Sequence, residues 1–310
     1  MAKDFNVKWI EQRCAGKTNF GNALTDISYI FFRAPGYMST GVFLNADSQE
    51  EAAIFSYEFV FEKQQLIYKY ARYSNMELQW EKLYVDGKII YDCNFTLRKF
   101  NFDNLKYIDA DTANTNRYLR SLEDGKEKDD IEESQLPFIR WLVNNVALKN
   151  DSILVELASY VGRMTVISSG NVMRFRPHRM YGAFFESLEK DDELKNLENF
   201  LNSMGIECSL VLKKLPDGQR ELYFSHEKLV PFFGTASSGT LALFDLYRRL
   251  FSFVTDPSFI YLDEFDAFYH YEMAENVMKF LKKRYPKCLI ILTSHNTNLM
   301  TNRKRLNFGR

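Results

Sequence analysis

Apolar and polar residues alternate between residues 54 and 100. Three runs carry large apolar side chains mostly two residues apart: Phe55, Tyr57, Phe59 and Phe61, then Leu66, Tyr68 and Tyr70, then Leu83, Val85, Ile89 and Tyr91. A period of two is typical of β-strands with one buried face. Turn residues such as Asp86 and Gly87 separate the runs. The pattern therefore predicts an antiparallel meander.

The rest of the chain reads as strands and helices in a different order. Residues 1–34 predict strand, loop and helix, and residues 216–218 predict the turn of a later hairpin. Beyond that hairpin a strand–helix–strand series continues to the end. We therefore expect three parts: the N-terminal part of an α/β core with the meander at 1–104, a mainly helical insertion at 105–227, and the C-terminal part of the core at 228–310.

Two adjacent acids follow a short apolar run near the C-terminus. Residues 259–262 are all apolar, and Asp263 and Glu264 come directly after them. Neither acid is stable inside a core, so both are expected at the carboxyl end of a buried strand, where α/β sheets bind ligands. There the first acid can hold Mg²⁺, and the second can accept a proton from an attacking water. A second predicted strand ends on His295, and the whole series predicts an NTPase.

A phosphate-binding candidate lies near the start of the chain. Gly16, Lys17 and Thr18 follow the first predicted strand and open a helix. A P-loop uses glycine to wrap backbone N–H groups around phosphates, Lys to contact the β and γ phosphates, and Ser or Thr to bind Mg²⁺. The first glycine of that pattern is expected at position 11, where the chain has Glu11. The alternative is a helix N-terminus that happens to carry a lysine.

Small and hydroxyl residues gather before a third predicted helix. Ser237, Ser238 and Gly239 lie in the sequence GTASSGT, and an apolar helix follows at 241–251. Backbone donors and the helix dipole make such a start suitable for an anion. An ordinary N-cap loop is the alternative. The position of the loop, shortly before the acid pair, favours the anion site.

Composition narrows the class of protein. The chain has 310 residues and a net charge of −1, which gives no global attraction to nucleic acid or membrane. No apolar run is long enough to span a membrane, and the N-terminus lacks a signal-peptide core. The four cysteines have neither metal-ligand spacing nor a disulfide pattern. A reduced, cytoplasmic protein is the simplest interpretation.

The order of these motifs resembles ABC-type ATPases. More narrowly, the chain is similar to the AAA-family, ABC-like ATPases of bacterial phage-defence systems, the RloA and OLD-like group. The matching stretches are GKTNFGNALTDI, SYEFVFEKQQLIYKYARY, WEKLYVDGKIIYD, ASSGTLALFDLYRRLF, FIYLDEFDAFYH and ILTSHNTNLMTNR. The resemblance implies an α/β P-loop NTPase of ABC type, in which the meander is the β subdomain and the helical insertion is a lid or arm.

The resemblance also implies how nucleotide is bound. Two loops would contact ATP: the Walker A residues Gly16, Lys17, Thr18 and Asn19, and the signature loop of Ser237, Ser238 and Gly239. The signature loop would reach ATP held by the opposing subunit, so the expected assembly is a homodimer that sandwiches the nucleotide. A separate nuclease is a possible effector partner in this group, whereas nucleic-acid binding finds no support in the net charge.

The remaining roles concern the metal and catalysis. By the same resemblance, Thr18 and Asp263 would hold Mg²⁺, Glu264 would activate water, and His295 would be the switch histidine. ATP and Mg²⁺ are thus the expected cofactors. Asp266 is expected either to contact the dimer partner or to cap the next helix.

Departures from the family pattern leave a second hypothesis open. Glu11 replaces the first Walker A glycine, Arg13 stands where an asparagine is usual, and relatives usually continue with a further strand beyond the His295 strand. These differences suggest a truncated or divergent member. The first hypothesis is a nucleotide-gated dimeric ATPase of an anti-phage system. The alternative is a non-catalytic interaction protein that keeps the ATPase fold with impaired turnover.

Overall fold

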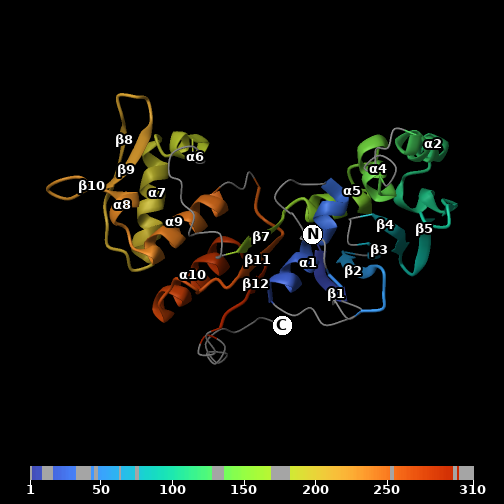
Figure 1. Cartoon of the computed structure of the whole chain (residues 1–310), viewed down its shortest axis with the longest axis horizontal. Coiled ribbons are helices and arrows are strands. Elements are labelled where there is room, and N and C mark those ends of the chain that lie inside the picture. The colour runs from blue at the N-terminus through green and yellow to red at the C-terminus, as the bar shows by residue number, and fades with distance from the viewer. Residues whose placement is uncertain are drawn as a thin grey trace. The chain divides into compact units, whose positions relative to one another are not determined.

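The computed structural model describes residues 2–8, 17–32, 43–44, 48–62, 64–73, 77–127, 136–168, 182–251, 255–295 and 299. The chain divides into two compact units, Met1–Met164 and Thr165–Arg310, and each unit is described by itself. Figure 1 shows the elements of both units along the chain. The three-part division expected from the sequence stays a prediction.

Unit 1 contains a six-stranded sheet in the order β1-β2-β3-β4-β5-β6, with antiparallel neighbours throughout. Its strands are β1 (Ala2–Lys8), β2 (Ala53–Phe61), β3 (Gln64–Arg72), β4 (Leu78–Val85), β5 (Lys88–Asn94) and β6 (Lys99–Asn101). Phe55, Tyr57 and Phe59 are buried at alternate positions of β2. The predicted meander is therefore confirmed, and β1 extends it by pairing with β2.

The turn between β4 and β5 has the predicted residues. β4 ends at Val85 and β5 begins at Lys88, so Asp86 and Gly87 form a two-residue turn. Both residues have positive φ, 48° at Asp86 and 77° at Gly87. Such a turn matches the right-handed twist of the paired strands, and glycine adopts it without steric cost.

Helices of unit 1 pack on the buried face of this sheet, with ring contacts to its strands (Figure 1). The helices are α1 (Lys17–Phe32), the 3₁₀ helix η1 (Leu105–Ile108), α2 (Thr115–Glu127), α4 (Phe138–Asn145) and α5 (Ile153–Val161). On α1, Ala23, Ile27 and Phe31 recur every four residues and are buried, as expected for an amphipathic helix. The Phe31 ring meets Tyr68 of β3 edge-on, with centroids 6.0 Å apart. The helix predicted within residues 1–34 is thus confirmed.

Unit 2 is built around a three-stranded sheet in the order β12-β11-β7. Its elements are β7 (Met164–Ser168), α6 (Gly182–Ser187), α7 (Asp191–Ser203), β8 (Leu210–Lys214), β9 (Arg220–Phe224), β10 (Val230–Pro231), α8 (Phe232–Thr235), α9 (Ser238–Phe251), β11 (Phe259–Asp263), α10 (Tyr271–Arg284) and β12 (Leu289–Leu292). β11 and β12 are parallel, with Leu262 beside Leu292. Parallel neighbours require a crossover, and α10 supplies it.

A small antiparallel sheet, β10-β9-β8, completes unit 2. Its β8–β9 hairpin turns around Gly218, which has a φ of 83°, so the predicted hairpin is confirmed. Phe244 of α9 and Ile260 of β11 belong to one buried hydrophobic cluster. That cluster fixes the position of α9 against β11, and the site described next lies at the ends of these two elements.

Candidate functional site

Asp263 is the last residue of the buried strand β11. Thr293, which directly follows β12, fixes the Asp263 side chain by a hydrogen bond. The Thr293 hydroxyl donates to Asp263 Oδ1 at 2.8 Å and accepts from the Glu264 backbone N–H at 2.8 Å. Backbone bonds from Thr293 N to Leu262 O and from Phe265 N to Thr293 O continue the β11–β12 pairing past Asp263. Asp263 is only 3% exposed, so its carboxylate is fixed and largely shielded from water.

Glu264 leaves the strand in an unusual backbone conformation. Its φ is 48°, in the left-handed region that costs a non-glycine residue roughly 1–2 kcal/mol. This conformation accompanies the end of β11 and leaves the Glu264 side chain 45% exposed. His295 Nε2 lies 3.1 Å from Glu264 Oε1. The structure therefore brings Asp263, Glu264 and His295 together.

Ser294 adds a third link between the two strand ends. Its hydroxyl donates to Asp266 Oδ2 at 2.6 Å. Helix α10 begins at Tyr271 with His270 as its N-cap, so the expectation that Asp266 caps this helix is wrong. Instead, Asp266 ties the loop after the acid pair to the segment after β12. Thr293 and Ser294 were not recognised as site residues from the sequence, although their position one strand away from the acids follows from the parallel pairing.

The candidate signature loop, Ser237 to Gly239, lies at the N-terminus of helix α9 in unit 2. Ser237 Oγ accepts from the Thr240 N–H at 3.1 Å and lies 2.8 Å from Thr240 Oγ1. The Ser237 hydroxyl thus caps the helix. A side chain at Gly239 would place its Cβ 2.8 Å from the Phe268 carbonyl oxygen. Only glycine allows this approach, which sets the first turn of α9 directly against the loop that follows Glu264.

The Walker A candidate belongs to unit 1. Lys17 and Thr18 are the first residues of α1, but their side chains lie outside the described part of the structure, as do Gly16 and Glu11. Asn19 is half-buried on the same helix. The meeting of these residues with the acid pair stays a prediction.

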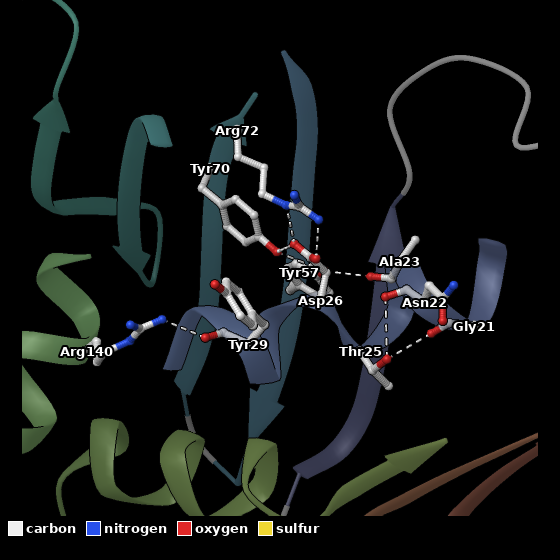
Figure 2. Close-up of polar contacts among 10 residues, drawn as sticks. All are labelled: Gly21, Asn22, Ala23, Thr25, Asp26, Tyr29, Tyr57, Tyr70, Arg72 and Arg140. Carbon is white, nitrogen blue, oxygen red and sulfur yellow. Dashed lines mark hydrogen bonds and ion pairs between the residues drawn. The ribbon is translucent and has the colours of Figure 1, made fainter. Parts of the chain in front are cut away.

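A buried ion pair anchors α1 to the sheet, as Figure 2 shows. Arg72 on β3 donates to Asp26 on α1 through Nη2 at 2.6 Å and through Nε at 2.9 Å. Their side chains are 1% and 0% exposed. The Tyr70 hydroxyl donates to the same carboxylate at 2.6 Å, and the Tyr57 hydroxyl donates to the Ala23 carbonyl at 2.6 Å. Burial raises the pKa of both tyrosines well above the usual value.

The C-terminal end of α1 is also held. Arg140 on α4 donates to the carbonyl oxygens of Ile30 and Tyr29, each at 2.7 Å. A guanidinium satisfies the free carbonyls at a helix C-terminus and complements its negative dipole end. With the Asp26–Arg72 pair, this contact fixes the C-terminal half of the helix that begins at Lys17.

The donors at the acid pair suit magnesium. Carboxylate and hydroxyl oxygens are the ligands that Mg²⁺ prefers, and Mg²⁺ is usually held by one or two carboxylates together with substrate phosphates. Among the described residues no group of three or more His, Cys, Asp or Glu could hold a metal. Asp263 and Glu264 thus supply the one or two carboxylates that such a magnesium site uses.

Comparison with known proteins identifies the family. A profile described as "AAA domain, putative AbiEii toxin, Type IV TA system" matches residues 15–301. The chain belongs to this family of AAA domains. The predicted AAA assignment and α/β fold class are therefore confirmed, while the narrower RloA and OLD-like group stays a prediction. A search of curated proteins gave no match. No helix among the described residues is long and apolar enough to cross a membrane.

Solved structures with similarity to this chain include heads of SMC proteins. One is the SmcHead bound to the C-winged helix domain of ScpA, with 12% identity, coverage of 94% of this chain and 82% of that chain, and a TM-score of 0.49. A second is the Smc head from Pyrococcus furiosus bound to the C-terminal domain of ScpA, with 13% identity, coverage of 93% of this chain and 82% of that chain, and a TM-score of 0.41. A third is the SMC head from Thermotoga maritima, with 13% identity, coverage of 94% and 80%, and a TM-score of 0.42. All three TM-scores are under 0.5, so the family assignment rests on the profile match.

Proposed function

We propose that this AAA-family chain binds and hydrolyses ATP as an ABC-like ATPase. The arrangement of the acid pair supports the proposal most directly. Asp263 is buried and fixed by Thr293, whereas Glu264 is partly exposed and contacts His295. One carboxylate is thus suited to a fixed metal ligand, and the other can reach a water molecule.

Each residue of the proposed site has one role in ATP hydrolysis. Asp263 and Thr18 would hold Mg²⁺, which neutralises charge on the β and γ phosphates when it is bound. Glu264 accepts the proton of the attacking water as the new oxygen–phosphorus bond forms and the bond to the β–γ bridging oxygen breaks. ADP and phosphate leave. His295 orients Glu264 through its ring nitrogen and contacts the γ-phosphate, which links the nucleotide state to the segment after β12.

We extend the proposal to a homodimer that closes on two nucleotides. Ser237 and Ser238 are exposed at the start of α9, where a helix N-terminus offers backbone donors to an anion. Walker A of one subunit would then face the signature loop of the other. Closure would move the helical arm and control a separate nuclease effector in an anti-phage system of the cytoplasm.

The Glu264→Gln variant tests the catalytic role. Gln keeps the shape of the side chain but cannot accept a proton, so we expect turnover to fall by about 10²–10⁴-fold while ATP binding is retained. An ATP-bound dimer should accumulate, which size-exclusion chromatography with light scattering measures. Glu272→Gln is the matched control, because Glu272 is an exposed acid in the first turn of α10. Unchanged steady-state turnover in Glu264→Gln would refute the mechanism.

Glu11 favours the alternative of a non-catalytic interaction protein. An acid beside the triphosphate repels it, and a β-carbon restricts the loop. In that case ATP with Mg²⁺ binds weakly or not at all, and the chain acts through its arm or through mixed dimers. Equilibrium binding separates the two functions: tight binding that Lys17→Ala abolishes excludes the alternative.

A further inference from the structure

A pocket of about 620 Å³ lies in unit 2, with α7, α9 and α10 supplying most of its wall. Its size is in the range of small-molecule sites. Four aromatic residues line it: Phe200, Tyr247, Phe280 and Tyr285. The Phe200 ring centroid is 5.1 Å from that of Tyr247 and 4.8 Å from that of Phe280. The aromatic wall is therefore continuous across the three helices.

The pocket is separate from the acid pair. Helix α9 starts at Ser238 and contributes Tyr247 and Leu250 from its last turns to the pocket. Helix α10 starts at Tyr271, shortly after the acid pair, and contributes its C-terminal residue Arg284. Each helix has 14 residues, and a helix of that length spans about 21 Å. The pocket thus lies at the opposite ends of these helices from the proposed ATP site.

The lining carries one excess negative charge. Glu193 and Asp256 are acidic and Arg284 is basic, so the formal net charge of the lining is −1. Arg284 pairs with Asp256 at 3.5 Å. Glu193 Oε2 is buried and has no hydrogen-bond partner among the described residues. Burial and then the Glu193 charge raise the pKa of the Tyr247 hydroxyl, so this carboxylate lies close to the aromatic wall.

We propose that this pocket binds an organic cation, an ammonium or guanidinium group, between Glu193 and the aromatic rings. A buried carboxylate oxygen without a partner calls for a donor, and a charged donor gives the stronger bond. Aromatic faces attract cations. The pocket already contains such a contact, because the Arg284 guanidinium lies 5.0 Å from the centroid of the Tyr285 ring. Asn196 and Asn199, which also line the pocket, offer amide oxygens to further N–H groups.

A bare metal ion fits this lining less well. Metal sites in proteins gather several carboxylate or imidazole ligands. Among the described residues no cluster of three or more such ligands exists, at the pocket or elsewhere. The faces of the four aromatic rings offer no ligand to a metal, whereas they suit the alkyl part of an organic cation.

The charge requirement can be tested with two small probes of nearly equal shape. Butylguanidinium is charged, and butylurea is its neutral counterpart. We expect butylguanidinium to bind the full chain and to shift the methyl NMR signals of Leu250, which lines the pocket, with butylurea binding at least about tenfold more weakly. Constant ionic strength is kept with NaCl. A blocked Gly-Gly-Arg-Gly-Gly peptide and its citrulline form then show whether the cation comes from a free small molecule or from a protein side chain.

Variants locate the binding to Glu193. Glu193→Gln should weaken butylguanidinium binding at least about tenfold and leave butylurea binding unchanged. Glu207→Gln, an exposed acid of the same unit outside the pocket lining, should change neither. Equal binding of the two probes, unshifted Leu250 signals, or full binding by Glu193→Gln would overturn the proposal. Turnover of ATP plays no part in this readout, so failure of the ATPase proposal leaves the test intact.

Discussion

Glu81 is a buried carboxyl group that joins the sheet of unit 1 to helix α4. It accepts hydrogen bonds from the Tyr68 hydroxyl at 2.8 Å, from the Tyr91 hydroxyl at 3.3 Å and from the Phe138 N–H. Phe138 is the first residue of α4, whose N-cap Pro137 provides no side-chain acceptor. Glu81, on a strand that is distant in the sequence, therefore caps the N-terminus of α4. Burial raises the pKa of Glu81 to about 7, although these hydrogen bonds act in the opposite direction.

The raised pKa predicts that unit 1 is more stable in mild acid. The folded chain holds the Glu81 proton more tightly than the unfolded chain, so the stabilisation is complete below the usual pKa of 4.5 and is lost as pH rises through about 7. We expect the free energy of unfolding to fall by up to about 3 kcal/mol from this group between pH 5 and 8. Glu81→Gln should remove this part of the pH dependence.

Urea unfolding followed by tryptophan fluorescence measures the effect. All three tryptophans, Trp9, Trp80 and Trp141, belong to unit 1, so the signal reports on that unit. Glu123→Gln is the control, because Glu123 is an exposed acid on α2. A pH profile of Glu81→Gln that matches the wild-type profile would show that Glu81 does not titrate in this range.

Individual residues could be predicted from the sequence only in part. The period of two in β4 places Glu81 on the same face as Leu83 and Val85, so its burial could have been inferred. Asp26 lies one residue before the buried Ile27 of α1 and was not recognised. The partner of Asp26 could not be predicted, because Arg72 lies 46 residues further along the chain, at the end of the second strand after α1, and no local pattern links the two. The hydrogen bond between Thr293 and Asp263 was not predicted for the same reason, because the two residues are distant in the sequence.

At the scale of elements, the contact between α9 and the loop after Glu264 depends on Gly239. A Cβ there would lie 2.8 Å from the Phe268 carbonyl oxygen, a backbone atom that cannot rotate away. We expect Gly239→Ala to push the start of α9 from this loop and to lower the free energy of unfolding by about 1–3 kcal/mol. Turnover should fall about tenfold or more, because the displaced loop follows Glu264, the proposed general base.

Gly234→Ala is the matched control for this variant. The nearest atom to a Cβ at Gly234 is Pro231 Cβ at 3.9 Å, an ordinary contact. Far-ultraviolet circular dichroism in urea and steady-state ATP turnover measure the two effects. If Gly239→Ala and Gly234→Ala behave alike, the close packing of α9 on the Phe268 loop has no role in the site.

Elements were easier to predict than their contacts. The strand before Asp263, the β8–β9 hairpin and the helix after Lys17 each follow from a local run of apolar or turn residues. The start of α9 was placed three residues too late, because Ser238, Gly239 and Thr240 have low helix propensity and only the Ser237 cap shows that they are helical. Caps and close glycine contacts depend on neighbours in space, which one sequence does not reveal.

At the scale of the whole molecule, the proposed function requires an ATP site to which two subunits contribute. Unit 1 carries Lys17 and Thr18, and unit 2 carries the acid pair together with the exposed Ser238. If Ser238 acts on ATP bound to the partner, a defect in Lys17 and a defect in Ser238 fall on the same site when they lie in different subunits, and the second site of that dimer carries neither defect. Two inactive variants can then form one intact site together.

Mixing Lys17→Ala with Ser238→Arg tests this arrangement. Each variant alone should be nearly inactive, the first through loss of phosphate binding and the second through bulk and charge at the dimer contact. In an equal mixture, random association makes about half of the dimers mixed, and each mixed dimer has one intact site out of two. We therefore expect the mixture to have about a quarter of the wild-type turnover. Adding Glu264→Gln to the Ser238→Arg subunit should abolish this turnover, because that subunit supplies Walker A and the acid pair of the intact site. A mixture no more active than its components would contradict the shared site, provided that co-purification of differently tagged subunits shows that mixed dimers have formed.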